Sequence, residues 1–254
     1  MAEEILFAGQ GGDEIRGELF RPSGDRRDSP GVIVVHEVFG LDEFTRSVAE
    51  RMARAGYVAL APDLYSRTGL PGPPGTAEDP APRWDIETVR SAVASLPDRR
   101  SAADLEAAAN WLAADRDVDG SSVAVLGFCA GGNQAFLMGC QSRRVAAVVM
   151  FYGRIVYADL SASKPVQPLE MALNLSVPLL AFFGEEDRSI PIADVDAMER
   201  TLAQFSKDAE VIRVPGVGHG FANPLRPGWD EVAAGAAWER TLAFLADSLG
   251  LSGD

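Results

Sequence analysis

The chain has 254 residues, of which 47% are hydrophobic, and it carries a formal net charge of −14. This length and composition allow a large buried core, and we expect a single domain over residues 1–254. A surface this negative repels phosphate backbones and anionic lipids, which argues against nucleic-acid and membrane partners. No apolar run approaches the roughly 20 residues that span a bilayer, and the acidic start MAEEILFAGQGGDE lacks the features of a signal peptide. We therefore expect a cytoplasmic protein.

Cysteines and histidines are scarce, and this limits the chemistry. Cys129 and Cys140 form no CxxC pair and no zinc-binding spacing. The only histidines are His36 and His219, so a histidine-rich metal site is excluded and no metal is expected. Any imidazole base must be one of these two residues.

The N-terminal third predicts a β-rich start followed by a helix. Polar and apolar residues alternate in two segments around the turn signal GQGGD, and a β-branched run and a short apolar run follow. We therefore predict strands at Glu3–Phe7, Glu14–Phe20, Gly31–His36 and Tyr57–Ala61, with a helix at Glu43–Ala55. Residues 66–85 hold five prolines and three glycines, which predicts a long loop of the kind that often serves as a lid.

The rest of the chain alternates helices with apolar strands. Ser101 and Asp104 have the spacing of a helix-capping pair, so a helix is predicted to start there. Strands are predicted at Ser122–Leu126, Val145–Phe151, Pro178–Phe183 and Glu210–Val214, and helices from the turn at 127–131 to about 140, at Ala193–Phe205 and at 229–249. This pattern predicts an α/β fold with a mostly parallel sheet and helices on both faces. Ligands in such folds bind beyond the carboxyl ends of the strands.

The segment GFCAGG at 127–132 follows one of these buried strands. It has the small-x-nucleophile-x-small pattern of the nucleophile elbow of α/β-hydrolases, with cysteine in the nucleophile position. Gly127 and Gly131 would leave room for the tight turn. Cys129 would lie at a helix N-terminus, where the helix dipole favours a thiolate. An ordinary buried cysteine is the alternative, and it applies more readily to Cys140.

An acid and a base follow in the order of this fold: nucleophile, acid, histidine. The loop GEEDRSIP at 184–191 offers three acids, of which Asp187 is preferred and Glu185 and Glu186 remain alternatives. His219 lies between glycines after the last predicted strand. Cys129 needs a base to take its proton, and His219 needs a carboxylate to fix its tautomer.

The loop after the strand Gly31–His36 supplies two more candidates. The N–H groups of Val38 and Ala130 are predicted to stabilise an oxyanion. Glu37 would raise the thiol pKa if its carboxylate lay beside the cysteine. An exposed acid, or an acid paired with arginine, is the alternative.

Together these segments resemble the dienelactone hydrolase (carboxymethylenebutenolidase) family. The resemblance rests on collinear motifs across most of the chain: HEVFG (36–40), GYVALAPDLY (56–65), PGTAEDP (74–80), DLEAA (104–108), GFCAGG (127–132), FYG (151–153), GEEDRSIP (184–191) and GVGHGFAN (216–223). It implies a Cys-His-Asp triad, a glutamate like Glu37 in contact with the resting thiol, and no cofactor. It also implies an enol-lactone substrate that carries a carboxylate, in bacterial breakdown of aromatic compounds.

The chain departs from the family where substrate is bound. Two arginines that bind the substrate carboxylate in known members correspond here to Asn223 and Ile86, so Arg83, Arg90 or Arg226 would have to replace them. We expect Arg83, Phe39, Tyr152, Phe221 and Asn223 to line the substrate site. The alternatives are an esterase or thioesterase for a substrate without a carboxylate, and a binding protein that has lost catalysis. The expected partner is a small-molecule substrate, and the expected assembly is a monomer or homodimer.

Overall fold

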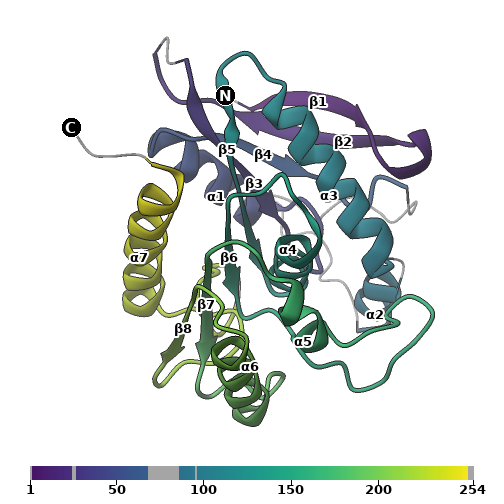
Figure 1. The fold of residues 1–254 in the computed structure, drawn as a ribbon, viewed down its shortest axis with the longest axis vertical. Coiled ribbons are helices and arrows are strands. Elements are labelled where there is room, and N and C mark those ends of the chain that lie inside the picture. Colours follow the sequence, from purple (N-terminus) through teal and green to yellow (C-terminus); the bar gives the residue numbers. More distant parts are fainter. Residues whose placement is uncertain (1, 25–26, 68–85, 95, 251–254) are drawn as a thin grey trace.

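An eight-stranded sheet forms the centre of the protein, as seen in a computed structural model that describes residues 2–24, 27–67, 86–94 and 96–250 (Figure 1). The strand order is β1-β2-β4-β3-β5-β6-β7-β8. The strands are β1 (Glu3–Ala8), β2 (Glu14–Phe20), β3 (Ser29–Val35), β4 (Val58–Pro62), β5 (Val118–Phe128), β6 (Ala147–Phe151), β7 (Leu179–Gly184) and β8 (Ala209–Val214). The β1–β2 hairpin joins β4 in antiparallel fashion, and all pairs from β4 to β8 are parallel. The predicted mostly parallel sheet is confirmed.

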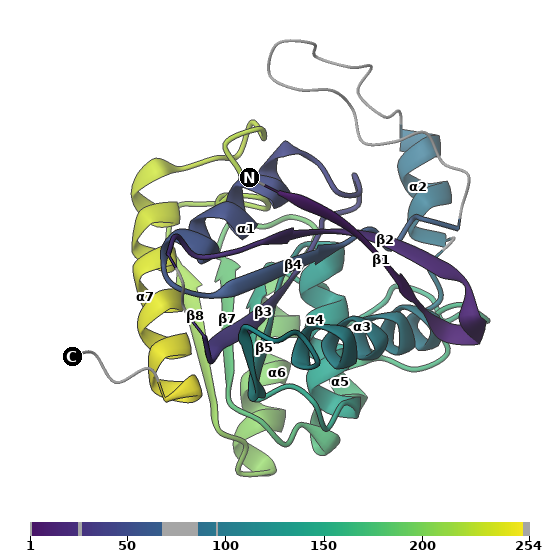
Figure 2. The same cartoon turned by 90° about the horizontal axis from the view of Figure 1, so that it is seen from above.

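Helices cover both faces of this sheet (Figure 2). Helices α1 and α7 lie on one face, and α3, α4 and α6 lie on the other. Their bounds are α1 (Glu43–Arg54), α2 (Ile86–Ala94), α3 (Asp98–Ala113), α4 (Ala130–Gln141), α5 (Pro168–Met171), α6 (Ile192–Gln204) and α7 (Glu231–Leu249), with short 3₁₀ turns η1 (Gln10–Gly12) and η2 (Ala172–Asn174). This is the arrangement of the α/β-hydrolase fold.

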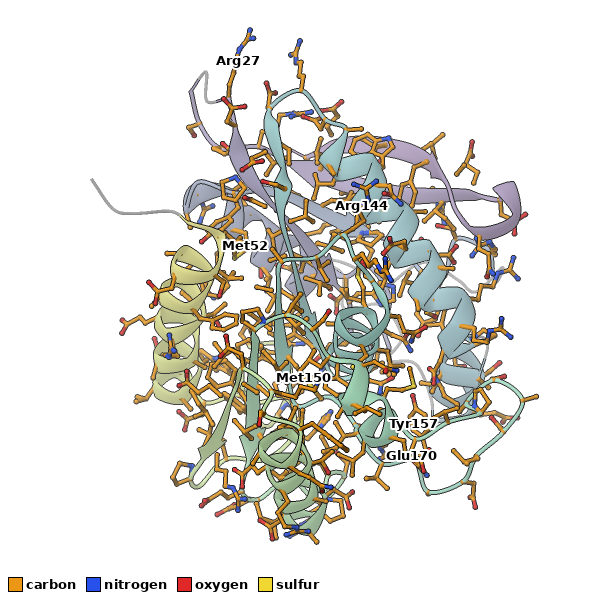
Figure 3. All side chains as sticks on the ribbon, in the orientation of Figure 1. Arg27, Met52, Arg144, Met150, Tyr157 and Glu170 are labelled. Carbon is orange, nitrogen blue, oxygen red and sulfur yellow. The ribbon has the colours of Figure 1, made fainter. Side chains whose placement is uncertain are left out.

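The core lies between the sheet and the two helical layers. Every residue of β3, β4, β6 and β7 is buried, which explains why these strands are apolar throughout. Figure 3 shows Met150 of β6 among the packed side chains, whereas Arg27 projects outward. The rings of Phe128, Phe151 and Phe182 stack across three adjacent strands, with centroids 4.7 and 4.6 Å apart. This aromatic layer supports the carboxyl ends of the strands.

Two local expectations have different outcomes, and one helix was not expected. The helix predicted to start at Ser101 starts at Asp98 instead, so the capping prediction is wrong. Asp104 is used elsewhere: its carboxylate accepts from the backbone N–H of Gln10 at 2.7 Å and pairs with Arg67. Helix α2 was not predicted. The loop 66–85 lies outside the described residues from position 68 onward, so its role as a lid stays a prediction.

Among the helices of the described residues, none has the length and apolar character needed to cross a membrane.

Candidate active site

Cys129 lies at the sharp turn between β5 and α4. Its backbone has φ 53° and ψ −116°, a strained conformation for a residue with a side chain. A Cβ added to Gly127 would collide with the carbonyl of Gly131, and one added to Gly131 would collide with the carbonyls of Val35 and His36. The glycines therefore allow the close approach of chain that the sequence pattern predicted.

His219 brings Cys129 and Asp187 into one hydrogen-bonded line. Its Nε2 lies 3.2 Å from the Sγ of Cys129, and its Nδ1 lies 2.7 Å from the Oδ2 of Asp187. The three residues come from the loops after β5, β7 and β8. These strands are parallel, so their carboxyl ends lie at the same edge of the sheet. Asp187 is buried, whereas Glu185 and Glu186 are exposed. Only Asp187 of the three acids therefore reaches the histidine.

The hydrogen bonds between these residues shift the pKa values of His219 and Asp187 in opposite directions. Burial lowers the pKa of His219, but its hydrogen bonds to Asp187 and Cys129 outweigh burial and raise the pKa to about 10. Burial raises the pKa of Asp187, but hydrogen bonds from His219 and Ser189 more than offset it and leave the pKa below its ordinary value. The arrangement therefore keeps Asp187 as a carboxylate and stabilises the imidazolium that forms when His219 takes a proton.

The second histidine and the second cysteine are unsuited to these roles. His36 is buried, its Nδ1 lies 2.6 Å from the carbonyl of Glu37, and its Nε2 accepts from the N–H of Leu64 at 3.2 Å. Burial lowers its pKa, so it stays neutral, with both nitrogens occupied. Burial also raises the pKa of the Cys140 thiol to about 12, which keeps it protonated.

Glu37 is buried at the edge of this site, and its carboxylate is already occupied. Its Oε2 accepts from Asn223 Nδ2 at 2.8 Å and from Arg226 Nε at 3.3 Å. Within the described part of the chain, no hydrogen bond joins Glu37 to Cys129, and the thiol pairs with His219. Burial raises the pKa of Glu37, although Arg226 acts in the opposite direction. Of the three interpretations given for this residue, pairing with an arginine is the one whose contact the structure describes.

Val38 and Ala130 lie just after β3 and β5, at the carboxyl ends of two neighbouring strands. Val38 follows the end of β3, and its carbonyl accepts from the hydroxyl of Tyr65 at 3.0 Å. Ala130 is the first residue of α4, where backbone N–H groups have no partner within the helix. Within the described ranges, neither residue donates its N–H to a protein acceptor. Both donors are thus available to a ligand.

The predicted substrate-binding residues differ in how they are placed. Tyr152 and Phe221 are fully buried, and their rings pack together at 5.5 Å, with Tyr152 also 5.0 Å from the His219 ring. Phe39 lies under the guanidinium of Arg226 at 3.4 Å. Asn223 is fully buried, and its Oδ1 accepts from the N–H of Leu225, so both ends of its amide are used within the protein. Arg83 lies outside the described residues.

Sequence reasoning missed one polar side chain at this site and gave another only as an alternative. Ser189, two positions after Asp187, contacts both Asp187 and His219. An Asp-x-Ser sequence often closes a side-chain turn, which is the signal that would have identified it. Arg226 was one of three arginines considered, and it is the one whose contact with Glu37 the structure describes. In the described ranges, no cluster of three or more His, Cys, Asp or Glu residues could hold a metal ion.

Comparison with known proteins identifies the family of this chain. A sequence model of the Dienelactone hydrolase family matches residues 15–249. A Salmonella typhimurium protein named "Putative carboxymethylenebutenolidase" is 35% identical over 243 residues, covering 95% of this chain and 86% of the relative. A Bradyrhizobium protein named "Probable 2-oxo-3-(5-oxofuran-2-ylidene)propanoate lactonase" is 30% identical over 245 residues, covering 96% and 94%.

Among solved structures, a Klebsiella pneumoniae protein described as "Putative Dienelactone Hydrolase" superimposes with a TM-score of 0.87 and 32% identity. The match covers 97% of this chain and 98% of the other. The family match spans most of the chain, and each of these relatives is at least 30% identical to it over most of both chains. The chain therefore belongs to the dienelactone hydrolase family of α/β-hydrolases.

Proposed function

We propose that this hydrolase cleaves a lactone or an activated ester by nucleophilic attack of Cys129, through a thioester intermediate. The observation that carries the proposal is the line of hydrogen bonds from Cys129 Sγ to His219 Nε2 at 3.2 Å and from His219 Nδ1 to Asp187 Oδ2 at 2.7 Å. A nucleophile, a base and an orienting carboxylate within hydrogen-bond reach are what covalent catalysis of acyl transfer requires.

The proposed reaction has two halves. In the first, the thiol proton of Cys129 passes to His219, the sulfur attacks the acyl carbon, and the N–H groups of Val38 and Ala130 stabilise the oxyanion. The C–O bond then breaks, and the leaving oxygen takes the proton from His219. In the second half, His219 takes a proton from water, the hydroxide attacks the thioester, and the acid leaves as the thiol regains its proton. Asp187 orients His219 throughout.

Glu37 is proposed to control the charge of the site. A buried carboxylate near the cysteine opposes a thiolate, and its hydrogen bonds to Asn223 and Arg226 hold part of that charge away from the sulfur. An anionic substrate that competed for Arg226 would change this balance. In this proposal, the charge of the substrate changes the reactivity of the Cys129 thiol through Glu37, and His219 takes the proton of that thiol.

The substrate is proposed to be an enol-lactone with a carboxylate, as in the breakdown of aromatic compounds. A thiolate is also a good leaving group, so the site suits esters with stabilised leaving groups better than amides. Arg226 is partly exposed beside Phe39 and is the cation that supports a carboxylate substrate. A neutral ester is the second candidate, because the amide of Asn223 is buried and already bonded to Glu37.

Covalent capture tests the proposal. The protein is mixed with p-nitrophenyl acetate, and the release of nitrophenol is recorded to detect a pre-steady-state burst. The masses of the intact protein and of its peptides are then measured by mass spectrometry. We expect an acetyl adduct on Cys129, its loss in Cys129→Ala, and near-normal turnover in Cys140→Ala. The buried Cys140 is a matched control, because it is the other thiol of the chain. Equal activity in both variants would overturn the assignment of the nucleophile.

A further inference from the structure

We propose that Ser189 is a positioning residue of this site, whose hydroxyl holds the Asp187 carboxylate and the His219 imidazole in line with Cys129. The inference deepens the proposed function and rests on it. Ser189 lies in the loop after β7, two residues beyond Asp187, and neither the family motifs nor the sequence pattern assigned it a role.

The contacts of Ser189 converge on the acid and the base. Its Oγ donates to Asp187 Oδ1 at 2.6 Å and lies 3.0 Å from His219 Nδ1. Its backbone N–H also donates to Asp187 Oδ1, at 2.7 Å, and the N–H of Ile190 does so at 3.2 Å. One carboxylate oxygen thus accepts the donors of this loop, which leaves Oδ2 to accept from His219 at 2.7 Å.

The backbone of Ser189 is itself tied to the nucleophile helix. The guanidinium of Arg154, in the loop after β6, donates to the Ser189 carbonyl at 3.1 Å. The side chain of Asn133 donates to the Arg154 carbonyl at 2.7 Å, and the Asn133 N–H donates to the carbonyl of Cys129 at 3.1 Å. These hydrogen bonds link the backbone of Cys129, through Asn133 and Arg154, to the backbone of Ser189. The side chain of Ser189 in turn contacts His219, whose ring lies against the Cys129 thiol.

The hydroxyl has a defined electrostatic consequence. Because its hydrogen points to Asp187, its lone pairs face the Nδ1–H of His219, which therefore has two acceptors instead of one. A second acceptor favours the imidazolium, and the imidazolium favours the thiolate. Among the described residues, Cys129, Glu37 and the ring of Tyr152 also interact with His219. None of these groups is removed by a change at position 189.

A turn of the same kind elsewhere in the chain separates local structure from function. Ser121 donates its N–H and its hydroxyl to Asp119 Oδ1, at 3.0 and 2.8 Å, in the same Asp-x-Ser arrangement. The described contacts of that pair include no histidine. What distinguishes Ser189 is the approach of its Oγ to His219.

The reactivity of the Cys129 thiol tests the proposal. Alkylation of the full-length protein by iodoacetamide is measured from pH 5 to 10, with peptide mass spectrometry to count only Cys129. We expect Ser189→Ala to slow the alkylation of Cys129 near neutral pH about two- to tenfold, which corresponds to the net free energy of one hydrogen bond. Ser189→Thr keeps the hydroxyl at an exposed position and should restore the wild-type profile. Ser121→Ala should leave the profile unchanged.

Two outcomes separate failure of this inference from failure of the proposed function. If Ser189→Ala keeps the wild-type profile while His219→Ala shifts it, the Cys-His pair operates and the role of Ser189 is overturned. If His219→Ala has no effect, the proposed pair itself is wrong. A shift in Ser189→Ala that Ser189→Thr fails to restore also counts against the hydroxyl.

Discussion

The side chain of Asn223 donates a hydrogen bond of 2.8 Å to the carboxylate of Glu37, although 186 positions separate the two residues. The bond joins the loop after β3 to the loop after β8, and both side chains are buried. It places the Glu37 carboxylate in a buried position at the edge of the candidate site, where it also interacts electrostatically with His219. The behaviour of Glu37 is therefore the first property of this site to test.

Glu37→Gln should make the melting temperature less sensitive to pH. Burial raises the pKa of Glu37, so the folded state favours its protonated form. That contribution to stability is fully present below the ordinary glutamate pKa and is lost as pH rises through the higher pKa of the folded protein. The variant should therefore gain in melting temperature over wild type as pH increases from 5 to 8. Glu185→Gln, at an exposed position, should show no such trend.

Arg226→Gln should separate the two candidate substrate classes. Its guanidinium is partly exposed beside Phe39, so it can pair with a substrate carboxylate. A hydrogen bond to a charged group contributes roughly 1.5–3 kcal/mol, so KM for a lactone with a carboxylate should rise about tenfold or more. KM for a neutral ester should change far less. Equal losses on both substrates, measured by steady-state kinetics, would contradict a carboxylate-binding role.

His219→Gln should reduce stability most at low pH. Burial lowers the pKa of His219, but Asp187 and Cys129 raise it to about 10, above its unfolded value. The resulting stabilisation is complete below pH about 6.5 and is lost as pH rises through 10. The difference in melting temperature between wild type and variant should therefore shrink between pH 6 and pH 10. A difference that stays constant would mean that Asp187 and the imidazolium contribute nothing to folding.

Gly131→Ala should be strongly destabilising, whereas Gly235→Ala should not. A Cβ at 131 would collide with the backbone carbonyls of Val35 and His36, which cannot move without disrupting β3. We expect a loss of about 3 kcal/mol in the free energy of unfolding. Gly235 lies exposed within α7 with nothing near its Cβ position, so alanine there should gain about 0.5–1 kcal/mol. Urea unfolding of both variants measures the contrast.

The sequence by itself determined the architecture of the sheet and the position of the tight turn that carries Cys129. The apolar runs of β3, β6 and β7 predict strands that are buried on both faces. The segment GFCAGG predicts a tight turn, because only glycine permits the backbone contacts that Gly127 and Gly131 make. These are local features. Each is encoded within a few consecutive residues, so they can be read without knowing where the rest of the chain lies.

Tertiary structure alone decided which polar groups meet. The local pattern of the loop 184–191 favoured Asp187 over Glu185 and Glu186, but the choice itself depends on which side chain turns inward toward His219. Likewise the helix expected at Ser101 begins at Asp98, where the carboxylate pairs with Lys164, far along the chain. Contacts such as Glu37 with Asn223, or Ser189 with His219, join separate loops at the ends of the strands. Their geometry depends on the order and register of the whole sheet, which no short segment encodes.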